Sequence, residues 1–244
     1  MNYINDDYSL TYNFNDPYPV WVLDNFLTDT LVQKIIDNWD CDYESDDWVS
    51  VRKTVNGMPN TLESGLYALN DKDKMPKIIS ECMDYFHGSV FLEFVKSLTG
   101  ILDLQSDKTA RWSGLRAMVP GAKQLIHSDA RVHPENGLKK ELTCLLYLNE
   151  NYSKETDEGC LEIWDDGMHN LCHSIEPINN RMVIFKNSEK SYHGVPIVKK
   201  ERRMITFSIM SDDYSTDRRQ YAKFVPRPTD DESVLIIGHK RGYL

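Results

Sequence analysis

Apolar residues in the first 100 positions recur mainly at the spacing of amphipathic helices. A short strand at residues 20–23 precedes a helix that Thr28 or Asp29 can cap. A second helical stretch covers residues 74–99 and breaks near Gly88. We therefore expect a mainly helical support at the N-terminal end of the chain.

From about residue 110 the hydrophobic period shortens to that of strands. Turn-forming pairs such as Pro120-Gly121 and Asn179-Asn180 separate the apolar segments. Many short strands at this spacing predict a sandwich or a barrel. The segments cover residues 113–119, 123–127, 141–148, 159–164, 181–185, 192–198 and 202–210.

This change of period predicts one structural domain in three parts. Residues 1–110 form a strand and helical support, residues 111–214 a β-core, and residues 215–244 a C-terminal tail. The polar stretch 42–62 contains Asn56-Gly57, a hairpin signal. We consider this stretch either a lid over the core or a plain surface loop.

Composition and charge narrow the class of partner. Hydrophobic residues make up 41% of the 244, as in an ordinary globular protein, and the formal net charge is -10. An acidic surface repels phosphate backbones, which argues against nucleic acid as the main partner. No apolar stretch has the length of a membrane span, so no membrane partner is expected. The oligomeric state leaves no signal in the sequence.

The five cysteines and the N-terminus indicate a reducing, cytoplasmic location. Their number is odd, and no pair shows metal-binding or redox spacing. The first ten residues have neither a cationic start nor an apolar region, so we expect no signal peptide.

A candidate metal site begins at His127-Ser128-Asp129. Side chains at alternate positions of a strand point the same way, so one segment can offer an imidazole and a carboxylate to one metal. His193, which follows a later strand, would complete the facial triad of non-haem iron(II) oxygenases. A His-x-Asp pair alone is weak, since chance also produces it and a surface loop explains it.

Arg202 strengthens the assignment because it opens a strand with clear alternation. Ile205 and Phe207 fall on one face with Arg203, whereas Arg202 shares the other face with Thr206. A buried Arg needs an anion, and its planar fork fits a carboxylate such as the distal one of 2-oxoglutarate. A surface salt bridge is the alternative, with Arg203 the candidate if the register differs by one.

The order of these motifs resembles the prolyl 4-hydroxylase-like branch of the 2-oxoglutarate/iron(II) dioxygenase superfamily. The resemblance covers about residues 113–210 and extends to an N-terminal entry strand at residues 22–27. It rests on Pro120-Gly121, His127-Ser128-Asp129, residues 142–149, Gly159-Cys160-Leu161-Glu162-Ile163-Trp164, Pro177, residues 181–185 and His193-Gly194-Val195-Pro196.

The resemblance implies a mainly β protein with supporting helices, an α+β chain whose core is a double-stranded β-helix, or jelly roll. It implies Fe(II), 2-oxoglutarate as cosubstrate and O2, with ascorbate as a further candidate. His127, Asp129 and His193 match the iron ligands, and Arg202 matches the residue that binds 2-oxoglutarate. The implied cosubstrate pocket also includes Tyr147, Thr206, Leu145, Thr143 and Leu161.

Two positions depart from the family pattern. Cys160 stands where a second glycine is common, and Val119 stands where many relatives have tyrosine. Both positions concern the fit of the cosubstrate and leave the metal ligands intact.

We consider four functions for a chain with these motifs. The first is hydroxylation of prolyl residues in a peptide or protein, and the second is hydroxylation of a free amino acid or another small molecule. The third, a nucleic-acid demethylase, is disfavoured because Ser208 stands where those enzymes have a second Arg. The fourth is a catalytically silent β-helix used as a binding module, which the intact ligand set disfavours.

Other residues near the core have simpler structural explanations. Trp112 and Trp164 are candidates to flank a substrate channel, with packing as the alternative. Arg116 and Met118 share a strand face before the metal motif and are candidates to line the site. Exposed loop positions are expected for His133, His169 and His173, and an exposed position in the C-terminal tail is expected for His239.

Overall fold

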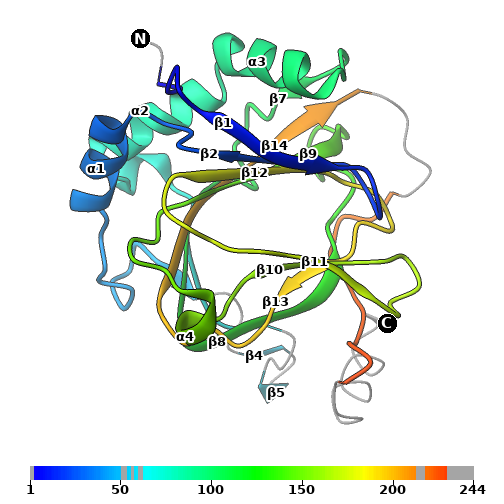
Figure 1. Cartoon of the computed structure of the whole chain (residues 1–244). Helices are drawn as coiled ribbons and strands as arrows, with labels where there is room; N and C mark the ends of the chain where they lie inside the picture. The colour runs from blue at the N-terminus through cyan, green and yellow to red at the C-terminus, as the bar shows by residue number, and fades with distance from the viewer. Residues whose placement is uncertain (1–2, 51–53, 56–57, 60–62, 213–217, 230–244) are drawn as a thin grey trace.

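An antiparallel sheet that curls back on itself dominates the fold. The computed structural model describes residues 3–50, 54–55, 58–59, 63–212 and 218–229. Thirteen strands within these ranges form one sheet, whose main path runs β1-β2-β12-β9-β14-β8-β13-β10-β11. In Figure 1 the β2, β12 and β9 layer faces the layer of β10, β13 and β11. The predicted jelly-roll core is confirmed.

The strands of this sheet come from both halves of the chain. The first group is β1 (Ser9–Phe14), β2 (Val20–Asp24), β3 (Val49–Ser50), β6 (Glu63–Leu69) and β7 (Gln105–Ser106). The second group is β8 (Gly114–Ser128), β9 (Lys139–Tyr147), β10 (Leu161–Trp164), β11 (Leu171–Ile175), β12 (Arg181–Lys186), β13 (His193–Val195), β14 (Arg202–Ser211) and β15 (Lys223–Phe224). A separate hairpin joins β4 (Thr54–Val55) to β5 (Met58–Pro59) and confirms the strand pairing around the predicted turn, whose residues 56–57 lie outside the described ranges.

Three helices cover the outer face of the upper layer in Figure 1. They are α1 (Asp29–Asp37), α2 (Lys77–Phe86) and α3 (Ser89–Thr99), and two shorter ones are η1 (Lys72–Lys74) and α4 (Lys154–Asp157). Gly88 separates α2 from α3, as the sequence predicts. No helix in the described ranges is both long enough and apolar enough to cross a membrane.

Strand alternation divides the core into an outer and an inner part. Ile205 and Phe207 of β14 pack with the helices in the outer core. Leu145 of β9 and Val183 of β12 belong to the inner core between the two layers. The inner layer of side chains is incomplete, because Arg202 and other polar groups of the same strand faces line a cavity there.

The long strand β8 joins the two layers and carries the first metal-ligand candidate. The sequence predicts two strands separated by a turn at Pro120-Gly121, but β8 continues through both residues. Gly121 has φ +87°. On the neighbouring β6, Gly65 lies where the pairing register between β6 and β8 shifts. Paired irregularities bend a strand without ending it, so the predicted turn is wrong.

The predicted three-part division of the chain stays a prediction, although its outer parts contribute strands to the sheet. From the N-terminal part, β2 pairs with β12 and β6 pairs with β8. From the predicted tail, β15 pairs with residues 127–128 of β8, and Phe224 is buried. Residues 222–225 therefore pack against the strand that carries His127.

Candidate active site

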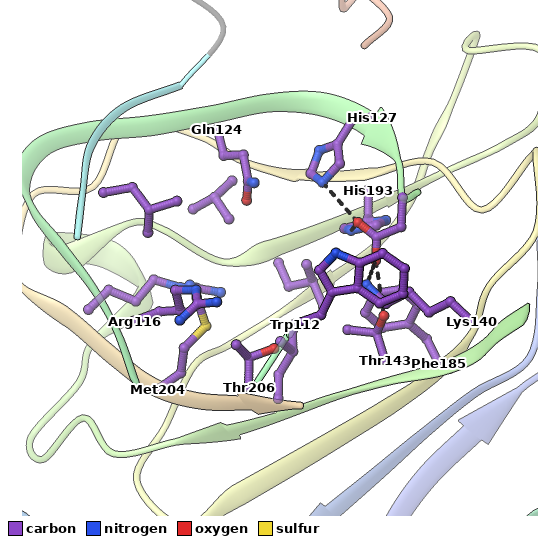
Figure 2. A pocket seen from close by; sticks show the side chains of 16 residues that line it. Trp112, Arg116, Gln124, His127, Lys140, Thr143, Phe185, His193, Met204 and Thr206 are labelled. Carbon is purple, nitrogen blue, oxygen red and sulfur yellow. Dashed lines mark hydrogen bonds and ion pairs between the residues drawn. The ribbon is translucent and has the colours of Figure 1, made fainter. Parts of the chain in front are cut away.

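Three candidate metal ligands converge between the two layers. His127 lies on β8, His193 begins β13 directly opposite it, and Asp129 follows β8. Their ligand atoms all lie within 4.8 Å of one another. Asp129 Oδ1 is 3.5 Å from His127 Nε2 and 3.9 Å from His193 Nε2. Figure 2 shows both imidazoles at one end of the pocket.

Close contact between β13 and β8 holds the two histidines side by side. A Cβ atom at Gly194 would lie 2.9 Å from the backbone oxygen of Gln124, so this position needs glycine. Each imidazole is also anchored by its Nδ1 atom, which lies 2.9 Å from Leu125 O for His127 and 2.9 Å from Ser191 O for His193. A carbonyl only accepts, so Nδ1 carries the hydrogen and Nε2 offers its lone pair to a metal.

A polar cluster holds the other oxygen of Asp129. Lys140 Nζ lies 2.7 Å from Asp129 Oδ2, and Thr143 Oγ1 donates to the same oxygen at 3.0 Å. The side-chain amide of Asn187 lies 2.9 Å from Thr143 Oγ1. With Oδ2 occupied in this way, Oδ1 faces the two histidines.

The charges around this cluster keep Asp129 ionised and His193 neutral at neutral pH. Burial alone would raise the pKa of Asp129, but Lys140, His127 and His193 hold it well below its usual range. Burial and the neighbouring His127 lower the pKa of His193 to about 4. Burial also acts to lower the pKa of His127, but its hydrogen bond to Asp129 outweighs this effect and raises it. An ionised carboxylate beside a neutral imidazole is the state that a metal requires.

Arg202 lies in the same cavity as the three ligands. Only 2% of it is exposed, and its Nη2 donates to the hydroxyl of Tyr147 at 2.9 Å. Its Nη1 contacts the sulfur atoms of Met204 and Met118, at 3.2 and 3.6 Å. Its Nε has no partner among the described residues. Arg203 points to the other face and pairs with Glu201 at 2.7 Å, so the predicted register is correct.

The structure brings four of the five remaining predicted site residues to the lining of this cavity, which has a volume of about 180 Å³. Thr206 lies on β14 with Arg202, and Leu145 and Thr143 lie on the neighbouring β9. Leu161 of β10 closes the opposite wall. Tyr147 is fully buried and is not one of the described lining residues, but its hydroxyl contacts Arg202, which lines the cavity. Burial raises the pKa of Tyr147, so its hydroxyl keeps its hydrogen and can donate it.

The sequence analysis did not identify two residues of the site, Lys140 and Asn187, and it named a third, Arg116, only as a candidate. Lys140 carries no motif, and plain alternation along β9 would place it on the face opposite Thr143, three residues further on. The shift of register between β9 and β14 at this point brings both side chains to Asp129. Asn187 follows β12 and also lacks a motif. Arg116, which was a candidate beside Met118, does line the cavity (Figure 2).

Several predictions for surrounding residues are corrected or limited. Trp112 lines the cavity, whereas Trp164 packs with Ile126 and Tyr192. His133 is fully buried, 2.8 Å from Thr109 Oγ1, so the predicted exposed loop position is wrong.

Other predictions for this region are confirmed only in part or cannot be examined. His169 is exposed as predicted, and His173 is half-buried against Phe14. His239 lies outside the described residues, as do residues 51–53, 56–57 and 60–62 of the stretch 42–62, so the choice between a lid and a surface loop stays open.

Comparisons with known proteins agree with this arrangement. Residues 113–210 match the family model of the 2OG-Fe(II) oxygenase superfamily. No curated protein matches the chain. A prolyl hydroxylase from Trichoplax adhaerens, solved with a peptide of hypoxia inducible factor, is similar in structure, with a TM-score of 0.57 and 16% identity, over 82% of this chain and 85% of that one.

Two further solved structures share the fold. A prolyl-4-hydroxylase from Pseudomonas putida has a TM-score of 0.58 and 18% identity, over 80% of this chain and 93% of that one. A prolyl 4-hydroxylase from Phytophthora capsici has a TM-score of 0.54 and 18% identity, over 92% of this chain and 68% of that one.

The family match coincides with the part of the chain that supplies all the candidate ligands. The donor set, two imidazole nitrogens and one carboxylate, suits Fe(II) and leaves coordination positions for other groups. The buried, unneutralised Arg202 suits a carboxylate of the cosubstrate. Residues 113–210 therefore form a 2OG-Fe(II) oxygenase domain, a family whose cofactors are Fe(II), 2-oxoglutarate and O2.

Proposed function

We propose that this oxygenase hydroxylates prolyl residues of a peptide or protein. In this proposal His127, Asp129 and His193 hold Fe(II), and Arg202 holds the distal carboxylate of 2-oxoglutarate. The observation that carries the proposal is a guanidinium buried in the same cavity as the three ligands, with no carboxylate partner among the described residues. A buried guanidinium without an anion is costly, so the cavity is suited to an anionic ligand.

The residues around Arg202 complete a carboxylate site. Tyr147 accepts a hydrogen bond from Arg202 and keeps its own hydrogen to donate to a carboxylate oxygen. Thr206 offers a second hydroxyl from the strand of Arg202. Leu145 and Leu161 form apolar walls that keep water away from the bound ligand.

The protein's own contribution to the reaction is orientation. Lys140 and Thr143 fix one oxygen of Asp129, and the two backbone carbonyls fix the histidines. When bound, Fe(II) and 2-oxoglutarate supply the chemistry that activates O2. Leu66, Trp112 and Val195 line the cavity with apolar surface that suits the ring of a prolyl residue. The similar prolyl hydroxylase structures support this choice of substrate.

The test is an anaerobic titration with Fe(II) and 2-oxoglutarate, followed by succinate release with prolyl peptides and free amino acids. We expect stoichiometric binding of both cofactors and stimulation of succinate release by prolyl peptides. Asp129→Ala should abolish turnover, whereas Asp166→Ala, which removes an exposed carboxylate paired with Lys190, should not. Unchanged succinate production by Asp129→Ala would refute the metal assignment, and stimulation by free amino acids alone would refute the peptide assignment.

A further inference from the structure

The cavity contains a second guanidinium that the proposed cosubstrate site leaves unused. Arg116 lies on β8 directly opposite Met204 of β14, and its side chain lines the cavity. Its Nη1 donates to the backbone oxygen of Leu115 at 2.7 Å, and no ion pair joins it to a described carboxylate. Burial lowers the pKa of Arg116 to about 10, which still leaves it charged at neutral pH.

The charges of the cavity show what Arg116 lacks. Its lining contains three cationic side chains, Arg116, Lys140 and Arg202, but Asp129 is the one carboxylate among the described lining residues. Lys140 already pairs with Asp129. Fe(II) and 2-oxoglutarate carry opposite charges of equal size, and the distal carboxylate of the cosubstrate faces Arg202. Arg116 therefore remains without an anion in the cavity after both cofactors bind. Its guanidinium is half-buried, so a carboxylate that enters the cavity and excludes water would find a charged partner there.

Arg116 and Arg202 are diagonal neighbours on one face of the β8–β14 pair, but they differ in their hydrogen bonds. Arg202 lies opposite Met118 in the β14–β8 pairing, and Arg116 lies two residues away from Met118 along β8. Arg202 bonds to Tyr147, whereas Arg116 bonds to the backbone of its own strand. In Figure 2 Arg116 lies at the end of the pocket away from Lys140 and His127.

We propose that Arg116 binds a carboxylate of the substrate, so that this enzyme selects substrates with an anionic group next to the residue that is hydroxylated. This inference rests on the proposed function, because it assumes that Arg202 and the metal take up 2-oxoglutarate. The carboxylate comes either from an acidic side chain beside the proline or from a C-terminal proline itself. In both cases the guanidinium pairs with a planar anion through two hydrogen bonds.

The experiment compares matched probes on the protein loaded with Fe(II) and 2-oxoglutarate without oxygen. One pair is N-acetylproline and N-acetylprolinamide, and the other is acetyl-Glu-Pro-amide and acetyl-Gln-Pro-amide, with binding measured by calorimetry. We expect the anionic member of at least one pair to bind roughly 10- to 100-fold more tightly than its neutral partner. The pair that shows the preference identifies the source of the carboxylate.

Variants assign the preference to Arg116. Arg116→Gln should remove it, and Arg116→Lys should keep part of it. Arg111→Gln, which removes an exposed charge paired with Glu135, should leave it unchanged. Equal or absent binding of both members in both pairs would overturn the inference, as would a preference that survives in Arg116→Gln.

Binding of 2-oxoglutarate separates this inference from the proposed function. If the unmodified protein fails to bind 2-oxoglutarate, the proposed function is wrong. If it binds 2-oxoglutarate and Arg116→Gln weakens that binding without changing the probe preference, Arg116 serves the cosubstrate and the inference about the substrate is wrong.

Discussion

The ammonium group of Lys140 lies 2.7 Å from Oδ2 of Asp129, on the side of the carboxylate opposite the two histidines. Lys140 contributes to the low pKa of Asp129. Removing it in Lys140→Met should raise this pKa, so that protons displace the metal at a higher pH than in the unmodified protein. We also expect activity at neutral pH to fall about 10- to 100-fold, because a partner that orients a ligand is lost.

The measurement is Fe(II) binding as a function of pH under anaerobic conditions. Lys139→Met is the matched control, since Lys139 is the neighbouring residue of β9 and pairs with Glu141 instead. If the Lys140→Met and unmodified proteins lose metal over the same pH range, Lys140 does not tune Asp129.

Arg202→Met should change stability and cosubstrate binding in opposite directions. The substitution removes a buried charge with no anionic partner among the described residues, so the cofactor-free protein should gain about 1 kcal/mol or more of stability. Affinity for 2-oxoglutarate should fall at least about tenfold, because a charge-assisted hydrogen bond is lost. Thermal unfolding and anaerobic titration check the two effects.

Arg203→Met provides the control for this pair of measurements. Arg203 is the next residue on β14 but pairs with Glu201 on the other face. The Arg203→Met substitution should leave the affinity for 2-oxoglutarate unchanged. A cofactor-free Arg202→Met protein that is less stable than the unmodified one would show that Arg202 already has a stabilising partner.

His87 should make the fold sensitive to acid. Its Nε2 is buried without a partner among the described residues, and burial lowers its pKa below the ordinary 6.5. The unfolded chain therefore takes up the proton at a higher pH than the folded protein. The stability that depends on a neutral His87 is fully present above about pH 6.5. It is lost as the pH falls through the lower pKa that His87 has in the folded protein.

Urea unfolding between pH 7 and pH 5 measures this contribution. His87→Phe should reduce the loss of stability over this range, whereas substitution of the exposed His169 by Gln should not change it. An identical loss in His87→Phe and the unmodified protein would rule out His87 as the group responsible.

Phe207 should be a major stabilising contact between the helices and the sheet. It is fully buried on the outer face of β14, and its ring stacks on Phe86 of α2 with centroids 4.6 Å apart. Phe207→Ala should cost about 3–5 kcal/mol in the free energy of unfolding, because it leaves a cavity. Urea unfolding checks this value, with the exposed Leu102→Ala expected within about 0.5 kcal/mol of the unmodified protein. A loss below 1 kcal/mol for Phe207→Ala would contradict this role.

Local patterns in the sequence determined the fold class and much of the site. Alternation along residues 202–210 placed Arg202 on the cavity face and Phe207 on the core face, because successive side chains of a strand point to opposite sides. The same rule put His127 and Asp129 on one side of the chain. These features depend on neighbours in the sequence, which a pattern can reveal.

Pairing between distant segments was decided only by the tertiary structure. Lys140 reaches Asp129, and Arg116 shares a cavity with Arg202, because β9 and β8 both border β14 in the curled sheet. The continuation of β8 past Pro120-Gly121 likewise depends on its pairing with β6. A strand's own sequence gives its two faces but not its neighbours, since those are selected by burial over the whole chain.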